Sequence, residues 1–108
     1  MIRLLILIAA IIAYALIGIV AAKADCSRMT ALAQEHAYSM HTRQSLDHKG
    51  FADRAARGAR AENVALASSK EQAIAMWMRS PAHYANMLLP GCRGYGWSGR
   101  YHVMEIGQ

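Results

Sequence analysis

The stretch WMRSPAHYANML, residues 77–88, decides how the chain divides into elements. Ser80 followed by Pro81 is typical of a helix N-terminus, with serine as the N-cap and proline in the first turn. The helix that they begin is predicted to run to about Leu88, where Leu89-Pro90-Gly91 ends it. A short helix is therefore expected directly after a break in the chain.

The segments upstream of this stretch predict three more helices. Ser68 and Ser69 stand three residues before Glu71 and Gln72, which makes two overlapping capping boxes for a helix that ends near residue 79. The other predicted elements, in chain order, are a helix over about 28–43 with apolar residues at helical spacing, a loop over 45–50, a short helix over 51–57 ended by Gly58, and an extended or irregular stretch over 59–67.

The tail from Arg93 to Ile106 predicts a β-hairpin, because large apolar residues nearly alternate around Ser98-Gly99. These residues are Tyr95, Trp97, Tyr101, Val103 and Ile106. With the helices before it, the tail predicts an α+β fold of three to four helices and a small C-terminal antiparallel sheet.

Residues 1–24 differ in composition from the rest of the chain. Arg3 is the only charge before Lys23, and residues 4–22 form an unbroken apolar run of 19 residues. Ala22-Lys23-Ala24 is the small-x-small pattern that signal peptidases cut. We therefore predict a signal peptide over 1–24 and a secreted or periplasmic domain over 25–108. The alternative is a retained membrane anchor over 4–22, since 19 apolar residues are just enough to span a bilayer.

The charge of the exported part is mildly basic. Of the 12 Lys and Arg, ten follow residue 24, and they stand against seven Asp and Glu, which gives a net charge of +3. This balance favours solubility and contains no dense basic run, so we expect no nucleic-acid partner.

Cys26 and Cys92 both lie in the exported part, and a single pair in an oxidising compartment predicts one disulfide. The bridge would close a loop of about 65 residues and contribute roughly 4 kcal/mol to a domain too small to rely on its core alone. Two unpaired buried thiols are the alternative.

His48, Glu62 and His83 are the candidate site residues. His83 would lie in the first turn of the helix that begins after Ser80, where the positive helix end favours a neutral imidazole. Two histidines and one carboxylate are the ligands of an open divalent-metal site, and they also suffice for general acid–base chemistry. Their spacing matches no local metal motif, so three ordinary polar residues on a domain surface remain the alternative.

Four other residues are expected to be structural or to have no role in the site. His36 lies on the apolar stripe of the first helix and is expected in the core, as is Trp77. His41 does not share a helix face with His36, so the two make a poor ligand pair, and we assign no role to His102.

Four blocks of the sequence resemble the bacterial branch of the CAP superfamily, the SCP domain of cysteine-rich secretory, antigen 5 and pathogenesis-related proteins. The blocks are HKGFADR at 48–54, AENVA at 61–65, WMRSPAHYANML at 77–88 and YHVMEIG at 101–107. They follow the family's order and cover nearly all of the exported part.

The resemblance implies a shortened α-β-α sandwich with a cleft lined by two histidines and two acidic residues. Block matching places His48, Glu62 and His83 in that cleft. The second acid would stand at Ser80, so at most three of the four are present. Asn63, Ser80 and Asn86 are supporting candidates, and Asn86, one turn beyond His83, is expected to hydrogen-bond to the Glu62-Asn63 segment.

Three functions follow, in the order in which we favour them. The first is a binding module that holds a divalent metal such as zinc, or a small molecule or lipid, without established catalysis. The second is a structural or interaction module of the cell envelope. The third is a metal-assisted hydrolase in which His83 or Glu62 activates water, although no serine or cysteine nucleophile is paired with these groups.

Overall fold

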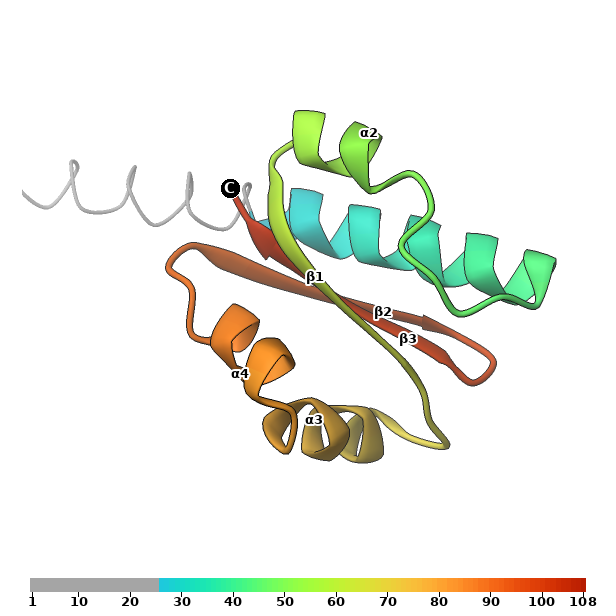
Figure 1. Cartoon of the computed structure of the whole chain (residues 1–108). Helices are drawn as coiled ribbons and strands as arrows, with labels where there is room; N and C mark the ends of the chain where they lie inside the picture. The colour runs from blue at the N-terminus through green and yellow to red at the C-terminus, as the bar shows by residue number, and fades with distance from the viewer. Residues whose placement is uncertain (1–25) are drawn as a thin grey trace, which may run out of the picture.

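The structure, a computed structural model, describes residues 26–108 as a three-layer arrangement with the sheet in the middle (Figure 1). The long first helix (26–43) and α2 (Phe51–Ala56) cover one face of the sheet, and α3 (Lys70–Met78) and α4 (Pro81–Met87) cover the other. The predicted α+β class and shortened sandwich are confirmed.

The predicted targeting segment, residues 1–24, lies outside the described residues. Within 26–108, no helix combines the length and the apolar character needed to cross a bilayer.

The sheet has three antiparallel strands in the order β1-β3-β2, which are β1 (Ala59–Leu66), β2 (Cys92–Ser98) and β3 (Tyr101–Gly107). The predicted hairpin is confirmed as β2 and β3. The stretch over 59–67, expected to be extended or irregular, supplies the third strand, which pairs with β3. Its sequence lacks a period of two because helices cover both faces of the sheet, so successive residues from Ala61 to Asn63 are all buried.

Small residues let the first helix lie close to β2. A side-chain carbon added at Gly94 would lie 2.1 Å from the backbone carbonyl carbon of Met29, and one added at Gly96 would lie 2.4 Å from the backbone nitrogen of Gln34. Only glycine fits at either position, so these two residues set the distance between the layers.

The predicted disulfide is confirmed. Cys26 and Cys92 are bonded, with their Cα atoms 4.8 Å apart, and the described residues contain no free cysteine. The bridge fastens the start of the first helix to the start of β2.

The helix starts follow the sequence closely. Ser69 caps α3, since its hydroxyl accepts a hydrogen bond from the Gln72 backbone N–H over 3.1 Å. Ser80 is the N-cap residue of α4 and Pro81 follows it, as predicted. The Ser80 hydroxyl does not cap the backbone but lies 2.8 Å from Nδ1 of His83.

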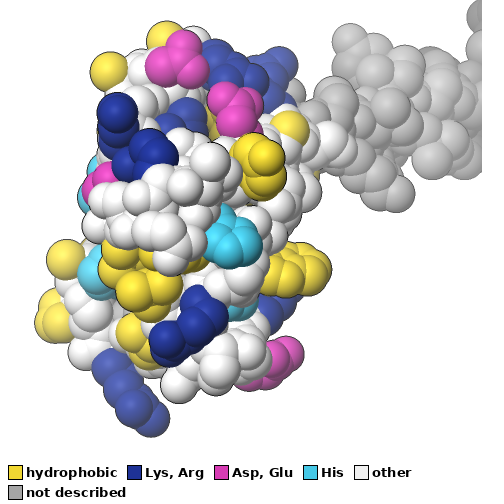
Figure 2. All heavy atoms as spheres, turned by 90° about the vertical axis from the view of Figure 1, so that its right-hand side faces the viewer, with side chains coloured by type: hydrophobic (Ala, Val, Ile, Leu, Met, Phe, Trp, Pro, Cys, Tyr) yellow, Lys and Arg dark blue, Asp and Glu magenta, His cyan; other side chains and the backbone are white. Residues whose placement is uncertain are grey.

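The surface carries both signs of charge. On the end of the molecule shown in Figure 2, basic side chains lie in separate groups, and those in the upper part stand beside acidic ones. No continuous basic stripe crosses this face, in keeping with the modest net charge of the sequence.

Candidate functional site

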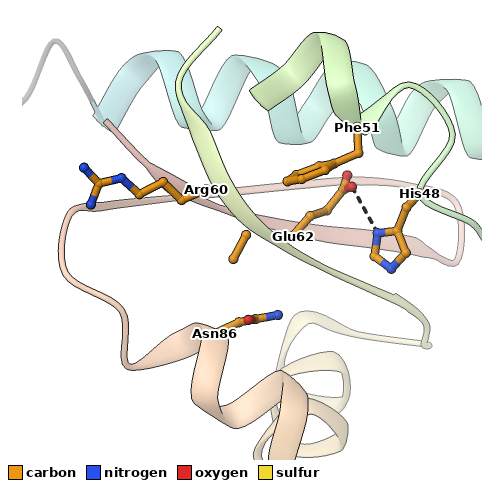
Figure 3. A pocket seen from close by; sticks show the side chains of 6 residues that line it. His48, Phe51, Arg60, Glu62 and Asn86 are labelled. Carbon is orange, nitrogen blue, oxygen red and sulfur yellow. Dashed lines mark hydrogen bonds and ion pairs between the residues drawn. The ribbon is translucent and has the colours of Figure 1, made fainter. Parts of the chain in front are cut away.

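A pocket of about 270 Å³ lies beside β1, between α2 and α4 (Figure 3). Strand β1 is at the edge of the sheet, so the pocket is open to solvent along that edge. Its lining residues come from the loop before α2, from α2, from β1 and from α4: they are His48, Phe51, Arg60, Ala61, Glu62 and Asn86. The pocket combines an apolar wall with a few polar groups, which is the usual composition of a small-ligand site.

His48 is an exposed ionisable group of this pocket next to β1. Its Nδ1 lies 3.0 Å from Oε2 of Glu62, and its side chain is 52% exposed. Because a carboxylate can only accept, Nδ1 carries the proton, and in the neutral ring Nε2 keeps a free lone pair. Glu62 thus fixes the tautomer of His48 and leaves Nε2 able to accept a proton or a hydrogen bond.

Glu62 is buried, and basic groups surround its carboxylate. Nη2 of Arg54 donates to Oε2 over 2.9 Å, and Nε2 of His36 lies 3.5 Å from Oε1. Burial by itself would raise the pKa of Glu62, but hydrogen bonds, including those from Arg54 and His48, lower it, so Glu62 is a carboxylate. His36 lies in the core, as predicted, and burial lowers its pKa, so its ring is neutral.

Arg54 also fixes the loop that carries His48. Its guanidinium donates to the backbone carbonyls of Lys49 over 2.8 Å and of His48 over 3.3 Å. One buried cation therefore holds both the carboxylate of Glu62 and the backbone that positions the imidazole of His48.

A second carboxyl group, Glu105, lies against this cluster. Glu105 is directly opposite Glu62 in the β1–β3 pairing, it is fully buried, and its Oε1 lies 3.4 Å from Nε of Arg54. Burial and the neighbouring Glu62 carboxylate raise the pKa of Glu105 to about 9. At neutral pH the two acids therefore hold one proton between them, and it resides on Glu105.

The α4 wall of the pocket is attached to β1 by two asparagines. Nδ2 of Asn86 donates to Oδ1 of Asn63 over 2.9 Å, and Nδ2 of Asn63 donates to the backbone carbonyl of His83 over 3.0 Å. The predicted hydrogen bond from Asn86 to the Glu62-Asn63 segment is confirmed.

Of the predicted site residues, the pocket brings together His48, Glu62 and Asn86. His83 does not line it: its side chain is half-buried and pairs with Ser80. Sequence reasoning missed Arg54 and Glu105. The only sequence signal for Glu105 is an acid within the apolar tail, and it does not reveal that this acid faces Glu62.

The geometry does not assemble the predicted metal ligands. Among residues 26–108, no group of three His, Cys, Asp or Glu side chains is placed to hold a metal ion. Oε2 of Glu62 is shared by Arg54 and His48, and His83 lies outside the pocket. Glu62 therefore acts here as the partner that orients His48, and metal binding stays a prediction of the sequence.

These features define the class of protein, a small disulfide-bonded α-β-α domain with a histidine–carboxylate pair at its open sheet edge. The family model of the cysteine-rich secretory proteins, the CAP family, matches residues 18–99, so the chain belongs to this family. No curated protein and no solved structure matches the chain.

Proposed function

We propose that this protein is an exported CAP module that binds a small ligand in the pocket beside β1. The observation that carries the proposal is the His48–Glu62 pair, in which a buried carboxylate orients a half-exposed imidazole towards an open pocket. Phe51 and Ala61 offer apolar contacts to the same ligand, so the expected occupant is small and partly apolar.

Export is part of the proposal. The disulfide is of the kind that persists in oxidising compartments, which supports a secreted or periplasmic domain of the family's bacterial branch. Cleavage after residue 24 and retention of an anchor over 4–22 both agree with this location. The mixed surface charge supports a partner other than nucleic acid.

A structural role in the cell envelope is the second candidate. It is favoured by the fact that Arg54, Asn63 and Asn86 each connect separate segments of the fold. In that case the family's sequence blocks would preserve the architecture alone.

Ligand titration followed by NMR tests the two candidates on the full chain with its disulfide intact. The probes are zinc chloride, lauric acid and a set of small aromatic and amide fragments. A binding module gives saturable shifts at Phe51, Ala61 and Asn86 with at least one probe, and His48→Ala removes them. His41→Ala is the matched control, because His41 pairs with Ser98 away from the pocket.

Saturation by no probe would favour the structural module. If zinc alone saturates, the metal prediction gains support, and hydrolysis of ester and peptide substrates should then be assayed. Turnover lost in His48→Ala would establish the hydrolase in place of a simple binding module.

A further inference from the structure

On each edge of the sheet, a side chain occupies an outward-facing backbone position. At the β2 edge, the side-chain amide of Gln34 occupies the outward-facing backbone groups of Trp97: Nε2 donates to the Trp97 carbonyl over 2.8 Å, and Oε1 accepts from the Trp97 N–H over 3.2 Å. This side chain takes the place of a further strand, so the β2 edge is closed to pairing at that point.

On β1, the direction of the backbone groups follows from one hydrogen bond. Nε1 of Trp77 donates to the carbonyl of Val64 over 3.1 Å, so the backbone groups of Val64 point away from β3. In an antiparallel pair, such outward-pointing residues alternate with inward-pointing ones. Glu62, two residues earlier, therefore also directs its backbone N–H and C=O to the free edge.

The Trp97 contacts at the opposite edge give the same result. Because the backbone groups of Trp97 point outwards, Trp97 and His102 exchange no backbone hydrogen bonds. Pairs with and without such bonds alternate along an antiparallel ladder, so Gly94 and Glu105, three pairs further on, do exchange them. Glu105 therefore turns its backbone groups towards β2, and those of Glu62 are left facing outwards.

The backbone of Glu62 is reached by solvent within the pocket. The whole residue is 6% exposed but its side chain only 1%, so the exposed part is mainly main chain. Glu62 lines the pocket, and no described residue occupies its outward N–H and C=O. Trp77 covers Val64 and Gln34 covers Trp97, whereas the outward backbone groups of Glu62 face the pocket.

We infer that the ligand of this pocket is a short extended peptide that adds a strand to the free edge of β1 at Glu62. The inference rests on the proposed function and specifies its ligand. The peptide would form two hydrogen bonds with Glu62, one to its backbone N–H and one to its C=O, in the manner of β-strand addition.

The pocket walls determine which peptide side chains fit. The peptide residue opposite Glu62 has its side chain on the α2 side, beside Phe51 and His48, and its neighbours turn towards Ala61 and Asn86 on the α4 side. Nε2 of His48 can accept a hydrogen bond from a peptide hydroxyl or amide.

Arg60 gives the peptide its expected charge. It is exposed at the end of the pocket away from His48, and no carboxylate of the described residues pairs with it, whereas Glu62 is already neutralised by Arg54 (Figure 3). The preferred peptide therefore carries a carboxylate, from an acidic side chain or from its C-terminus.

The test uses a positional-scanning library of fluorescent acetylated pentapeptides, with aspartate fixed at the C-terminal position, titrated by polarisation against the full chain. The best sequence is then resynthesised with a single N-methyl group at each position in turn. Strand addition predicts that methylation opposite Glu62 weakens binding about tenfold or more, because one hydrogen bond is lost and the backbones clash. Methylation at adjacent positions, whose N–H groups face away, should have little effect.

Two controls separate charge from backbone pairing. Arg60→Gln should weaken binding of the acidic peptide several-fold and remove its preference over the matching C-terminal asparagine amide, whereas Arg79→Gln should change neither. Hydrogen exchange at the Glu62 amide should slow on binding.

The inference is overturned if no library peptide binds, or if one binds with equal tolerance of N-methylation at every position. Its failure is distinguishable from that of the proposed function. If zinc, lauric acid or a fragment saturates the pocket in a His48-dependent way while peptides do not, the pocket binds ligands but not by strand addition.

Discussion

Apolar packing is present on both faces of the sheet, but the second face, beneath the first helix and α2, also encloses a group of ionisable side chains. On the first face, beneath α3 and α4, Trp77 packs with Met104 and Ile106. On the second, Met40 packs with Val103, and Glu62 and Glu105 share Arg54 with His36 beside them. Apolar burial is non-directional and stabilises the fold as such, while buried charges cost free energy unless their partners are in place. The second face therefore depends on a specific arrangement, and the pocket is built on that arrangement.

Removing the Trp77 side chain from the apolar cluster beneath α3 and α4 should have the largest effect on stability. Trp77→Ala would leave a cavity against β1 and β3 and would remove the hydrogen bond to the Val64 carbonyl. We expect a loss of about 5 kcal/mol in the free energy of unfolding, measured by urea denaturation. Trp97→Ala is the control, because the Trp97 side chain is mostly exposed. An equal loss in both variants would contradict the comparison.

Removing Arg54 from the face beneath the first helix and α2 should reduce the free energy of unfolding by somewhat less. Arg54→Met leaves Glu62 buried without its main partner, and we expect a loss of about 3 kcal/mol. The double variant Arg54→Met with Glu62→Gln should recover part of that loss, because no uncompensated charge is left. If the double variant is less stable than Arg54→Met alone, charge pairing is not what Arg54 supplies.

The proton held by Glu105 should make stability depend on pH. Its pKa is raised to about 9 in the folded state, so the folded protein binds this proton more tightly than the unfolded chain. The contribution is therefore fully present below the unfolded pKa and is lost as the pH rises towards 9. Melting temperatures between pH 5 and 9 should fall less steeply in Glu105→Gln than in the wild type. Glu35→Gln, which alters an exposed ion pair with Arg57, should keep the wild-type slope.

The smallest effect on stability is expected from the side-chain hydrogen bond that joins α4 to β1. Asn86→Ala would leave Oδ1 of Asn63 without its donor, at a cost of about 1–2 kcal/mol. Faster hydrogen exchange in α4 than in the first helix would show that the loss is local. Unchanged exchange in α4 would mean that other contacts hold this helix.

The elements that could be predicted from the sequence are those specified by local signals. Ser69, Ser80 with Pro81, and Gly58 mark helix ends through short-range backbone chemistry, and the structure follows them. The strand over 59–66 was harder to predict because burial on both faces removes the alternation that identifies a strand.

The site could be predicted only in part, for a different reason. His48, Glu62 and Asn86 came from block resemblance, which transfers residues but not contacts. The pairing of Glu62 with Glu105 depends on the register of strands far apart in the sequence, and no local pattern contains that register. Arg54 was similarly missed as the cation that connects them, since an arginine in a short helix is normally solvated.

The side chains that occupy the sheet edges also have a consequence for assembly. A sheet with open edges can recruit a copy at each side and grow into a fibre, and an interrupted edge opposes such growth. Gln34 interrupts the β2 edge at Trp97, and Trp77 interrupts the β1 edge at Val64, so neither edge offers an unbroken row of backbone groups to a copy of the domain. A second copy that paired at Glu62 would compete with a peptide for the same strand.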